Sequence, residues 1–298
     1  MSIFKRHPNR IKESKVDIAF RWINIILLLI FVVVVAFPIL SYFALAFSNG
    51  AYNLDVILLP RGWTLQPFVY IFTGADSYYF WRSVLNSVII TVCVTVGSNL
   101  VEAFAAYPLS KSDCPFRGGI LMYFIITMLF SAGVVPIYLW MHMLNLLDNI
   151  ASLILISISN VFNLLLFKTF FEGLPADIEE AAKLDGASEM QMFFRILLPM
   201  SLPVIGSCCF FSVVGTWNSY GSALLFISSS AREAYPLAYY IYNMLNVANI
   251  NKTDPWVLIN VKNIQSASML VSIIPILCIY PYIVKYIKSG ITVGSVKG

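Results

Sequence analysis

Six of the fifteen acidic residues in this 298-residue chain lie between Glu172 and Glu189. Other side chains suited to chemistry are scarce: there are two histidines and five cysteines, and no two cysteines have the CxxC spacing. We therefore expect neither a metal centre nor a disulfide framework. The sequence also contains no GxxxxGK[ST] motif, so we do not expect the chain to bind ATP through a P-loop. The clustered carboxylates are the main chemical feature to be explained.

The residues around these carboxylates predict two short helices joined by a corner. Asp177 and Glu180 have the spacing of an N-cap residue and its partner at position N3, and Ser188 and Gln191 repeat that spacing. Gly186 lies between the two pairs, where the end of a helix favours a residue with positive φ. Residues 172–198 are therefore predicted to form a helix, a glycine corner and a second helix.

Each predicted helix has an apolar face that needs a partner, because isolated helices of about ten residues are marginal in water. The faces comprise Ile178, Ala181 and Ala182 in the first helix, and Met190, Phe193, Phe194 and Leu197 in the second. Helices that lie on a membrane surface favour Lys and Arg on their polar side, whereas this pair carries mainly Asp and Glu. A basic groove on a separate cytoplasmic protein is the better match.

The rest of the chain is apolar, with 59% hydrophobic and 11% charged residues, and this composition predicts a membrane protein. Six stretches are long enough to cross a bilayer as helices: 22–47, 84–108, 119–140, 150–170, 200–227 and 264–287. The first stretch is too long for the apolar part of a signal peptide, so we expect it to be retained. The predicted fold is all-α, with six transmembrane helices in one domain, 1–298.

The distribution of Lys and Arg predicts how these helices are oriented. Fourteen of these residues fall on the side that carries both termini and residues 172–198, and five fall on the other side. The positive-inside rule then places the tail 1–21, the C-terminus and residues 172–198 in the cytoplasm. The net charge of +4 is interpreted as a topology signal and not as a nucleic-acid-binding surface.

Two external loops, 48–83 and 228–263, follow from this orientation. The stretch "YPLAYYIYNML" in the second loop predicts a short amphipathic helix. Both loops are rich in aromatic residues that could anchor the chain at the membrane interface or contact a ligand or partner. These residues are Trp63, Tyr78, Tyr79, Trp81, Tyr235, Tyr239 and Tyr240.

Several polar residues fall inside the expected spans, where contact with lipid would be costly. They are Asn86, Asn99, Glu102, Asn160, Asn163, Trp217, Asn218 and Tyr220. Such side chains should face the interior of the helix bundle or a water-filled path. Hydrogen bonds between helices would explain some of them without any ligand.

The stretch "EEAAKLDGASEMQMFFRILLP" resembles the EAA loop of ATP-binding-cassette (ABC) importer permeases. The matching positions are Glu180, Ala181, Ala182, Gly186, Ile196, Leu198 and Pro199. The resemblance covers nearly the whole chain and includes "WTLQPFVYIF", "NSVIITV", "AAYPLSK", "LPADIEEAA", "WNSYGSALLFI" and the tail "GITVGSVKG". These segments are similar to the carbohydrate-uptake permeases, and among them to the oligosaccharide type.

This resemblance implies a transport subunit without an enzyme site, in the cytoplasmic membrane of a bacterium. Such a subunit pairs with a second homologous permease and an external solute-binding protein, and with two ATPase subunits that bind ATP and Mg. It binds no cofactor itself, and it moves an oligosaccharide by alternating access. The residues implied to contact the ATPase are Glu179, Glu180, Ala181, Ala182, Asp185, Gly186, Met190, Phe193 and Phe194.

A sugar path should combine hydrogen-bonding groups with aromatic rings that pack on C–H surfaces. Trp217, Asn218 and Tyr220 offer both in the fifth expected span, and we expect Asn86 and Asn163 opposite them. Family members commonly have a smaller or acidic residue after the Trp-Asn pair. The Ser-Tyr pair at 219–220 therefore predicts a lining particular to this transporter.

Three alternatives differ from this interpretation. An importer permease for a non-sugar solute would share the whole motif set. A secondary transporter should show inverted repeats or interrupted helices with ion ligands, which the sequence does not reveal. An intramembrane enzyme would need a nucleophile with a base, or a metal set, within the spans, and His7 and His142 are poorly placed for this.

Overall fold

The computed structural model describes residues 14–49, 58–246 and 261–294, and all regular structure among them is helical. The helices are α1 (Lys15–Ala46), α2 (Gln66–Thr73), α3 (Ser77–Ser110), α4 (Arg117–Leu129), α5 (Val134–Met143), α6 (Ile150–Ser157), α7 (Val161–Glu172), α8 (Ala176–Leu184), α9 (Glu189–Met192), the π-helical turn η1 (Phe193–Leu197), α10 (Leu198–Met200), α11 (Leu202–Trp217), α12 (Gly221–Phe226), the 3₁₀ turn η2 (Arg232–Ala234), α13 (Leu237–Asn246) and α14 (Val261–Gly294). Most of the expected tail 1–21, and residues 247–260 of the second expected external loop, lie outside the described residues.

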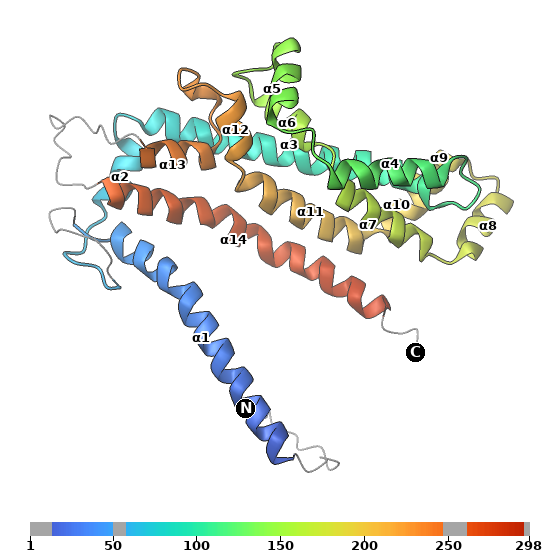
Figure 1. The fold of residues 1–298 in the computed structure, drawn as a ribbon, viewed down its shortest axis with the longest axis horizontal. Helices are drawn as coiled ribbons and strands as arrows, with labels where there is room; N and C mark the ends of the chain where they lie inside the picture. The colour runs from blue at the N-terminus through green and yellow to red at the C-terminus, as the bar shows by residue number, and fades with distance from the viewer. Residues whose placement is uncertain (1–13, 50–57, 247–260, 295–298) are drawn as a thin grey trace.

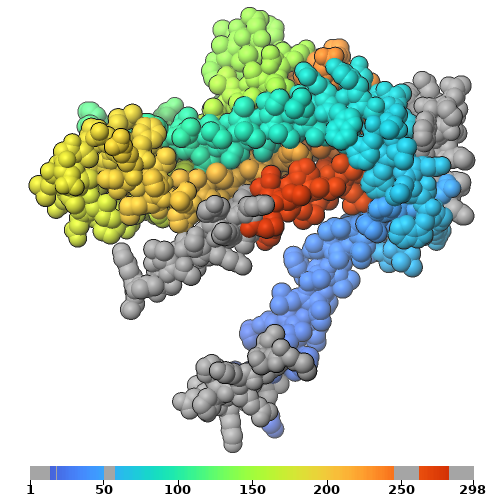
Figure 2. All heavy atoms as spheres, turned by 180° about the vertical axis from the view of Figure 1, so that it is seen from behind, coloured from blue at the N-terminus to red at the C-terminus, as the bar shows by residue number. Residues whose placement is uncertain are grey.

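The body of the molecule is elongated, with α3, α11 and α14 running along its length and α7 packed on α3 (Figure 1). Helices α2, α12 and α13 lie at one end of this body, and α8 and α9 lie at the other (Figure 1). Helix α1 packs on α14 near its C-terminal end and then diverges from the body (Figures 1 and 2). Its apolar side chains are exposed over most of its length, which suits a helix surrounded by lipid or by another chain.

Within the described ranges, three helices are individually long and apolar enough to cross a membrane: α1, α3 and residues 262–281 of α14. Three further spans would each consist of two helices that meet at a bend. These pairs are α4 with α5 at 105°, α6 with α7 at 41°, and residues 189–200 with α11 at 76°. Counting each bent pair as one span gives six, as expected, but the predicted continuous helices 119–140, 150–170 and 200–227 are wrong.

The interruptions coincide with residues that disfavour a continuous helix. Gly133 adopts φ 83° and is the N-cap residue of α5. Asn160 is the N-cap residue of α7, and its side-chain oxygen accepts a hydrogen bond from the Phe162 N–H at 2.9 Å. Pro199 and Pro203 lie on either side of the bend before α11. The apolar composition continues through all three places, so hydropathy alone does not reveal them.

Two clusters of buried side chains hold the two ends of the body together. One cluster joins α2, α12 and α13 to the near ends of α3 and α14, and includes Phe80, Leu237 and Tyr240. The other joins α3, α7 and η1, and includes Phe167 and Phe193. The predicted amphipathic helix at 235–245 is confirmed as α13. Tyr235, Tyr239 and Tyr240 are buried in the first cluster, so they are not exposed as either of the two expected roles, interface anchor or ligand or partner contact, would require.

Candidate functional site

The loop between α7 and α11 folds as a helix, a corner and a second helix. Gly186 adopts φ 78° and follows Asp185, the C-cap residue of α8, as its position in the sequence predicts. Ser188 and Gln191 form the predicted capping box at the start of α9, with reciprocal bonds of 3.3 and 3.0 Å. The predicted cap at Asp177 is wrong, because Pro175 precedes α8 as its N-cap and α8 begins at Ala176 without a side-chain cap. Asp177 therefore lies inside the first turn.

The residues expected to contact an ATPase divide into outward-facing and inward-facing sets. Glu180, Ala181, Asp185, Gly186, Met190 and Phe194 are exposed, Glu179 is half-buried, and Ala182 and Phe193 are buried. The Phe193 ring packs on Phe104 and Tyr107 of α3, with centroid distances of 4.5 and 5.5 Å. Phe193 thus attaches the loop to the body. Leu184, which is 89% exposed and was not singled out in the sequence, extends the outward apolar surface.

Lys111, at the end of α3, is the polar attachment point of this loop. Its ammonium group lies 2.7 Å from a carboxylate oxygen of Glu189 and 3.6 Å from one of Glu179, so it bridges α9 and α8. It also lies 4.3 Å from the centroid of the Tyr107 ring, and the Tyr107 hydroxyl donates to the same Glu189 oxygen. Burial disfavours the charged form of Lys111, but its hydrogen bonds with Glu189 and Tyr107 outweigh this effect and raise its pKa above the usual range.

A second group of ion pairs attaches the other end of the loop. The Arg117 guanidinium at the start of α4 pairs with Glu172, the last residue of α7. Lys168, one turn earlier in α7, lies 2.9 Å from the same carboxylate. The Arg117 Nε also donates to the Leu109 carbonyl oxygen of α3 at 2.9 Å. The loop is therefore fixed to α3 and α4 at both ends, while its corner projects away from the body.

Two of the expected substrate-path residues are engaged in hydrogen bonds within the protein. The Asn86 amide donates to the carbonyl oxygens of Glu233 and Tyr235, at 2.7 and 3.0 Å, and so connects α3 to the loop before α13. The Trp217 indole N–H donates to the Ser272 carbonyl oxygen of α14 at 3.0 Å. Both side chains are buried. The structure places them as connections between helices, which is the alternative that the sequence left open.

The other three expected path residues are placed differently. Asn163 is buried between α7 and α3, and its side-chain oxygen has no hydrogen-bond partner among the described residues. Asn218 is exposed just after α11 and donates to the Val214 carbonyl oxygen. Tyr220 is also exposed, and one face of its ring stacks on Tyr242 with centroids 4.8 Å apart and ring planes at 18°. Asn163 therefore does not meet Asn218 and Tyr220 in an open site.

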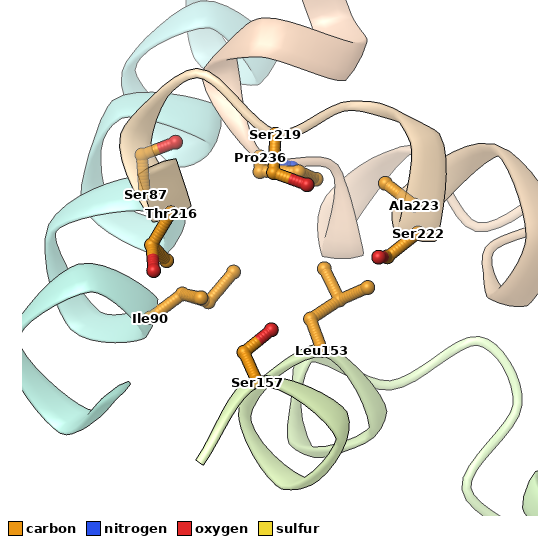
Figure 3. Close-up of a pocket in the computed structure, with 9 residues that line it drawn as sticks. All are labelled: Ser87, Ile90, Leu153, Ser157, Thr216, Ser219, Ser222, Ala223 and Pro236. Atoms are coloured by element: carbon orange, nitrogen blue, oxygen red, sulfur yellow. The ribbon is translucent and has the colours of Figure 1, made fainter. Parts of the chain in front are cut away.

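A small open hollow lies beside these exposed residues, where α3, α6 and α12 meet (Figure 3). Hydroxyl groups and aliphatic side chains line it, and no charged side chain does. The lining residues are Ser87, Ile90, Leu153, Ser157, Thr216, Ser219, Ser222, Ala223 and Pro236. Its hydroxyl groups suit neutral hydrogen-bonding groups of a ligand. The sequence analysis did not find these serines, because a lone Ser in an apolar helix gives no signal of its own.

The contacts of Asn86 predict a measurable stability effect. Asn86→Ala would leave the buried Tyr235 carbonyl oxygen and the part-buried Glu233 carbonyl oxygen without this donor, and we expect a loss of about 1–3 kcal/mol in the free energy of unfolding. Thermal unfolding of the detergent-purified protein measures it. Asn218→Ala is the matched control, because the exposed Asn218 amide bonds only within its own helix. Equal unfolding temperatures for the two variants would contradict the assigned role of Asn86.

Comparisons with known proteins agree with this architecture. The family model described as "Binding-protein-dependent transport system inner membrane component" matches residues 8–293. The polygalacturonan/rhamnogalacturonan transport system permease protein YtcP of Bacillus subtilis is 34% identical over 278 residues, which cover 91% of this chain and 96% of YtcP. Protein LplC of the same organism is 36% identical over 267 residues, which cover 88% of this chain and 89% of LplC.

A solved structure matches as well. It is the crystal structure of a bacterial ABC transporter involved in the import of the acidic polysaccharide alginate, and one of its chains has a TM-score of 0.84 and 28% sequence identity. The match covers 93% of this chain and 99% of that one. The family match, the relatives and the bent apolar helices agree that this is a multi-pass membrane protein. The chain belongs to the family of binding-protein-dependent transport system inner membrane components, which are permease subunits of ABC transporters.

Proposed function

We propose that this chain is one permease half of an ATP-driven importer that brings oligosaccharides into the cell by alternating access. The single observation that carries this proposal is the loop from α8 to α9. The corner of this loop exposes both acidic and apolar side chains, and ion pairs attach both ends of the loop to the body. A force applied to such a corner would be passed to α3, α4 and α7.

The partners follow from the same loop and from the family. In this proposal two ATPase subunits bind ATP and Mg, and one of them receives Glu180, Leu184, Met190 and Phe194 in a basic and apolar groove. A second homologous permease completes the translocation path. An external solute-binding protein delivers the sugar to the end of the molecule that carries α12 and α13. This assignment places the termini and the loop 172–198 in the cytoplasm, in agreement with the charge distribution.

The substrate class is supported by the relatives and by the hollow. One relative is named for the transport of polygalacturonan and rhamnogalacturonan and another for that of arabinooligosaccharides, and the matching solved transporter is involved in the import of alginate. The hollow of this chain offers hydroxyl groups, and the exposed Tyr220 directly follows Ser219 of its lining. Hydroxyl groups and an aromatic face are what a sugar ring requires.

Co-purification with the neighbouring gene products tests the assembly. We expect a tagged chain to retain two ATPase subunits and a second permease after detergent extraction. In proteoliposomes, the loaded solute-binding protein should stimulate ATP hydrolysis and sugar uptake. A panel of oligosaccharides, screened by the thermal stabilisation of the solute-binding protein, identifies the sugar to use. Uptake that proceeds without ATPase subunits would contradict the proposal.

Substitutions at the hollow separate a substrate contact from packing. Trp217→Ala removes a buried ring, and we expect it to destabilise the protein by about 3–5 kcal/mol and to lower its amount in the membrane. Tyr220→Ala should leave the amount unchanged and slow uptake severalfold, because Tyr220 is exposed and directly follows Ser219, which lines the hollow. Tyr220→Phe keeps the ring and is the matched control. Normal uptake by Tyr220→Ala at normal protein level would exclude Tyr220 from the path.

A further inference from the structure

The interruption between α6 and α7 leaves backbone N–H groups without a partner in their own helix, and a residue of another helix accepts one of these hydrogen bonds. Helix α6 ends at Ser157, α7 begins at Val161, and their axes differ by 41°. The first N–H groups of a new helix have no partner within that helix. In a bilayer such groups must be satisfied by protein. Asn160 satisfies one of them, because its side chain accepts from the Phe162 N–H.

Glu102 of α3 accepts a hydrogen bond from a second of these backbone N–H groups. Its carboxyl Oε1 accepts a hydrogen bond from the Asn160 backbone N–H at 2.8 Å, across 58 residues of sequence. Asn160 is the N-cap residue of α7, so Glu102 contacts this helix at its start. The positive end of the α7 dipole favours an acceptor at this position. Glu102 is 1% exposed, which makes this contact part of the protein interior.

Helix α3 also accommodates the interruption at Gly97. A Cβ atom on Gly97 would lie 2.9 Å from Cδ1 of Ile158, the residue that directly follows α6. The absence of a side chain at Gly97 therefore lets Ile158 approach α3 closely. Ile158 thus lies against Gly97 and the Asn160 N–H bonds to Glu102, so residues 158–160 pack on α3 at two points.

The two helices that meet here lead to the two functional regions. Helix α6 contributes Leu153 and Ser157 to the hollow, and both side chains point toward it (Figure 3). Helix α7 continues to Glu172, where the ion pairs with Lys168 and Arg117 attach the loop that precedes α8. Residues 158–160 connect α7 to α6 along the chain, and both helices also pack on α3.

We infer that Glu102 is a positioning residue that links movement of the loop 172–198 to the hollow, by holding the Asn160 N–H at the interruption. This role rests on the proposed function, and it adds a path by which movement of the loop 172–198 is transmitted to the hollow. It requires one acceptor oxygen at the position of Oε1, and it does not require a second oxygen. Glu102→Gln should therefore preserve it, and Glu102→Leu should abolish it.

The first experiment measures sugar taken up per ATP hydrolysed, with the whole transporter in proteoliposomes. We expect Glu102→Leu to assemble and hydrolyse ATP, but to lower this ratio about tenfold, because the Asn160 N–H loses its acceptor within an expected membrane span. Glu102→Gln should stay within about twofold of wild type, since its amide oxygen can still accept. A normal ratio in Glu102→Leu, or an equal loss in both variants, would overturn the inference.

The second experiment needs no knowledge of the sugar. Ser157→Cys is introduced into a chain whose five native cysteines are replaced, and its reaction rate with N-ethylmaleimide is measured with and without ATP and Mg. We expect ATP to change the rate in this background and in the Glu102→Gln version, and to have no effect in the Glu102→Leu version. An unchanged ATP response in Glu102→Leu would refute the linkage. Absence of sugar uptake in wild type would count against the proposed substrate and leave this result intact.

Gly97→Ala provides a separate approach if Glu102→Leu fails to assemble. Its Cβ would lie 2.9 Å from Cδ1 of Ile158, so the Ile158 side chain would have to move. We expect a smaller fall in the uptake ratio, together with a weaker ATP response at position 157. Gly215→Ala is the matched control, because a Cβ at Gly215 would meet no atom within 4 Å. Equal behaviour of Gly97→Ala and Gly215→Ala would overturn the inference independently of Glu102.

Discussion

Gly186→Val should insert into the membrane at a normal level and lose sugar uptake. The φ of Gly186 is 78°, a conformation that costs a β-branched residue about 1 kcal/mol or more. A Cβ at this position would meet no atom within 4 Å, so the effect comes from the backbone and not from a clash. Relief of the strain would turn α8 relative to α9 and displace Leu184 and Met190 from their partner surface. The spans are untouched by this change.

The measurement is ATP hydrolysis and uptake by the reconstituted transporter. We expect Gly186→Val to bind the ATPase subunits loosely, or to hydrolyse ATP without response to the loaded solute-binding protein. Gly186→Asn should be milder, because Asn tolerates positive φ. Gly119→Val is the matched control, since Gly119 is helical and a Cβ there meets no atom within 4 Å. Wild-type uptake by Gly186→Val would refute the assignment of this loop to coupling.

Glu180→Ala should be a weaker form of the same defect. Glu180 is exposed and lies within α8. The substitution therefore removes a charge from the partner surface but does not remove a helix cap. We expect a reduced stimulation of ATP hydrolysis by the loaded solute-binding protein at a normal amount of complex. Glu180→Gln, which keeps the length of the side chain, tests whether the charge itself is needed. Full stimulation in both variants would place Glu180 outside the contact.

Features of the loop that depend on neighbouring residues were predictable from the sequence. The capping box is local because Ser188 and Gln191 are three residues apart. The positive φ is local because it is a property of Gly186 alone. The predicted cap at Asp177 failed for an equally local reason: the fixed φ of Pro175 starts the helix two residues earlier than the acidic pattern suggests. The sequence thus contains two helix-start signals, Pro175 and Asp177, and the helix begins after the proline.

Features that depend on distant backbone groups were not predictable. The amide of Asn86 bonds to carbonyl oxygens 147 and 149 residues away, so no local pattern distinguishes it from a residue in a water-filled path. The helix interruptions follow from single Gly, Asn and Pro residues inside continuous apolar composition. Lys111 was counted only as a positive charge that sets orientation, because its contacts with Glu179 and Glu189 arise only when α3 meets the folded loop.

Lys111→Glu should uncouple the transporter strongly. Lys111 is the one group that bridges α8, α9 and α3 among the described ion pairs, and its side chain is 17% exposed. Its replacement by Glu would set three carboxylates together and push α9 away from Tyr107. We expect uptake to fall about tenfold or more while the complex still assembles through the buried Phe193. Lys111→Arg keeps the charge and should retain most of the activity.

The exchange of both charges tests the interaction itself. Glu189→Lys alone should fail as Lys111→Glu does, and the double variant Lys111→Glu/Glu189→Lys should recover part of the uptake, because it restores opposite charges at 2.7 Å. Lys183→Glu is the matched control: Lys183 lies 4.0 Å from the same carboxylate, but both side chains are more than half exposed, so we expect little change. If the losses of the two single variants simply added in the double variant, the pair would not be coupled. The attachment of the loop would then depend on Phe193 and its ring contacts with Phe104 and Tyr107.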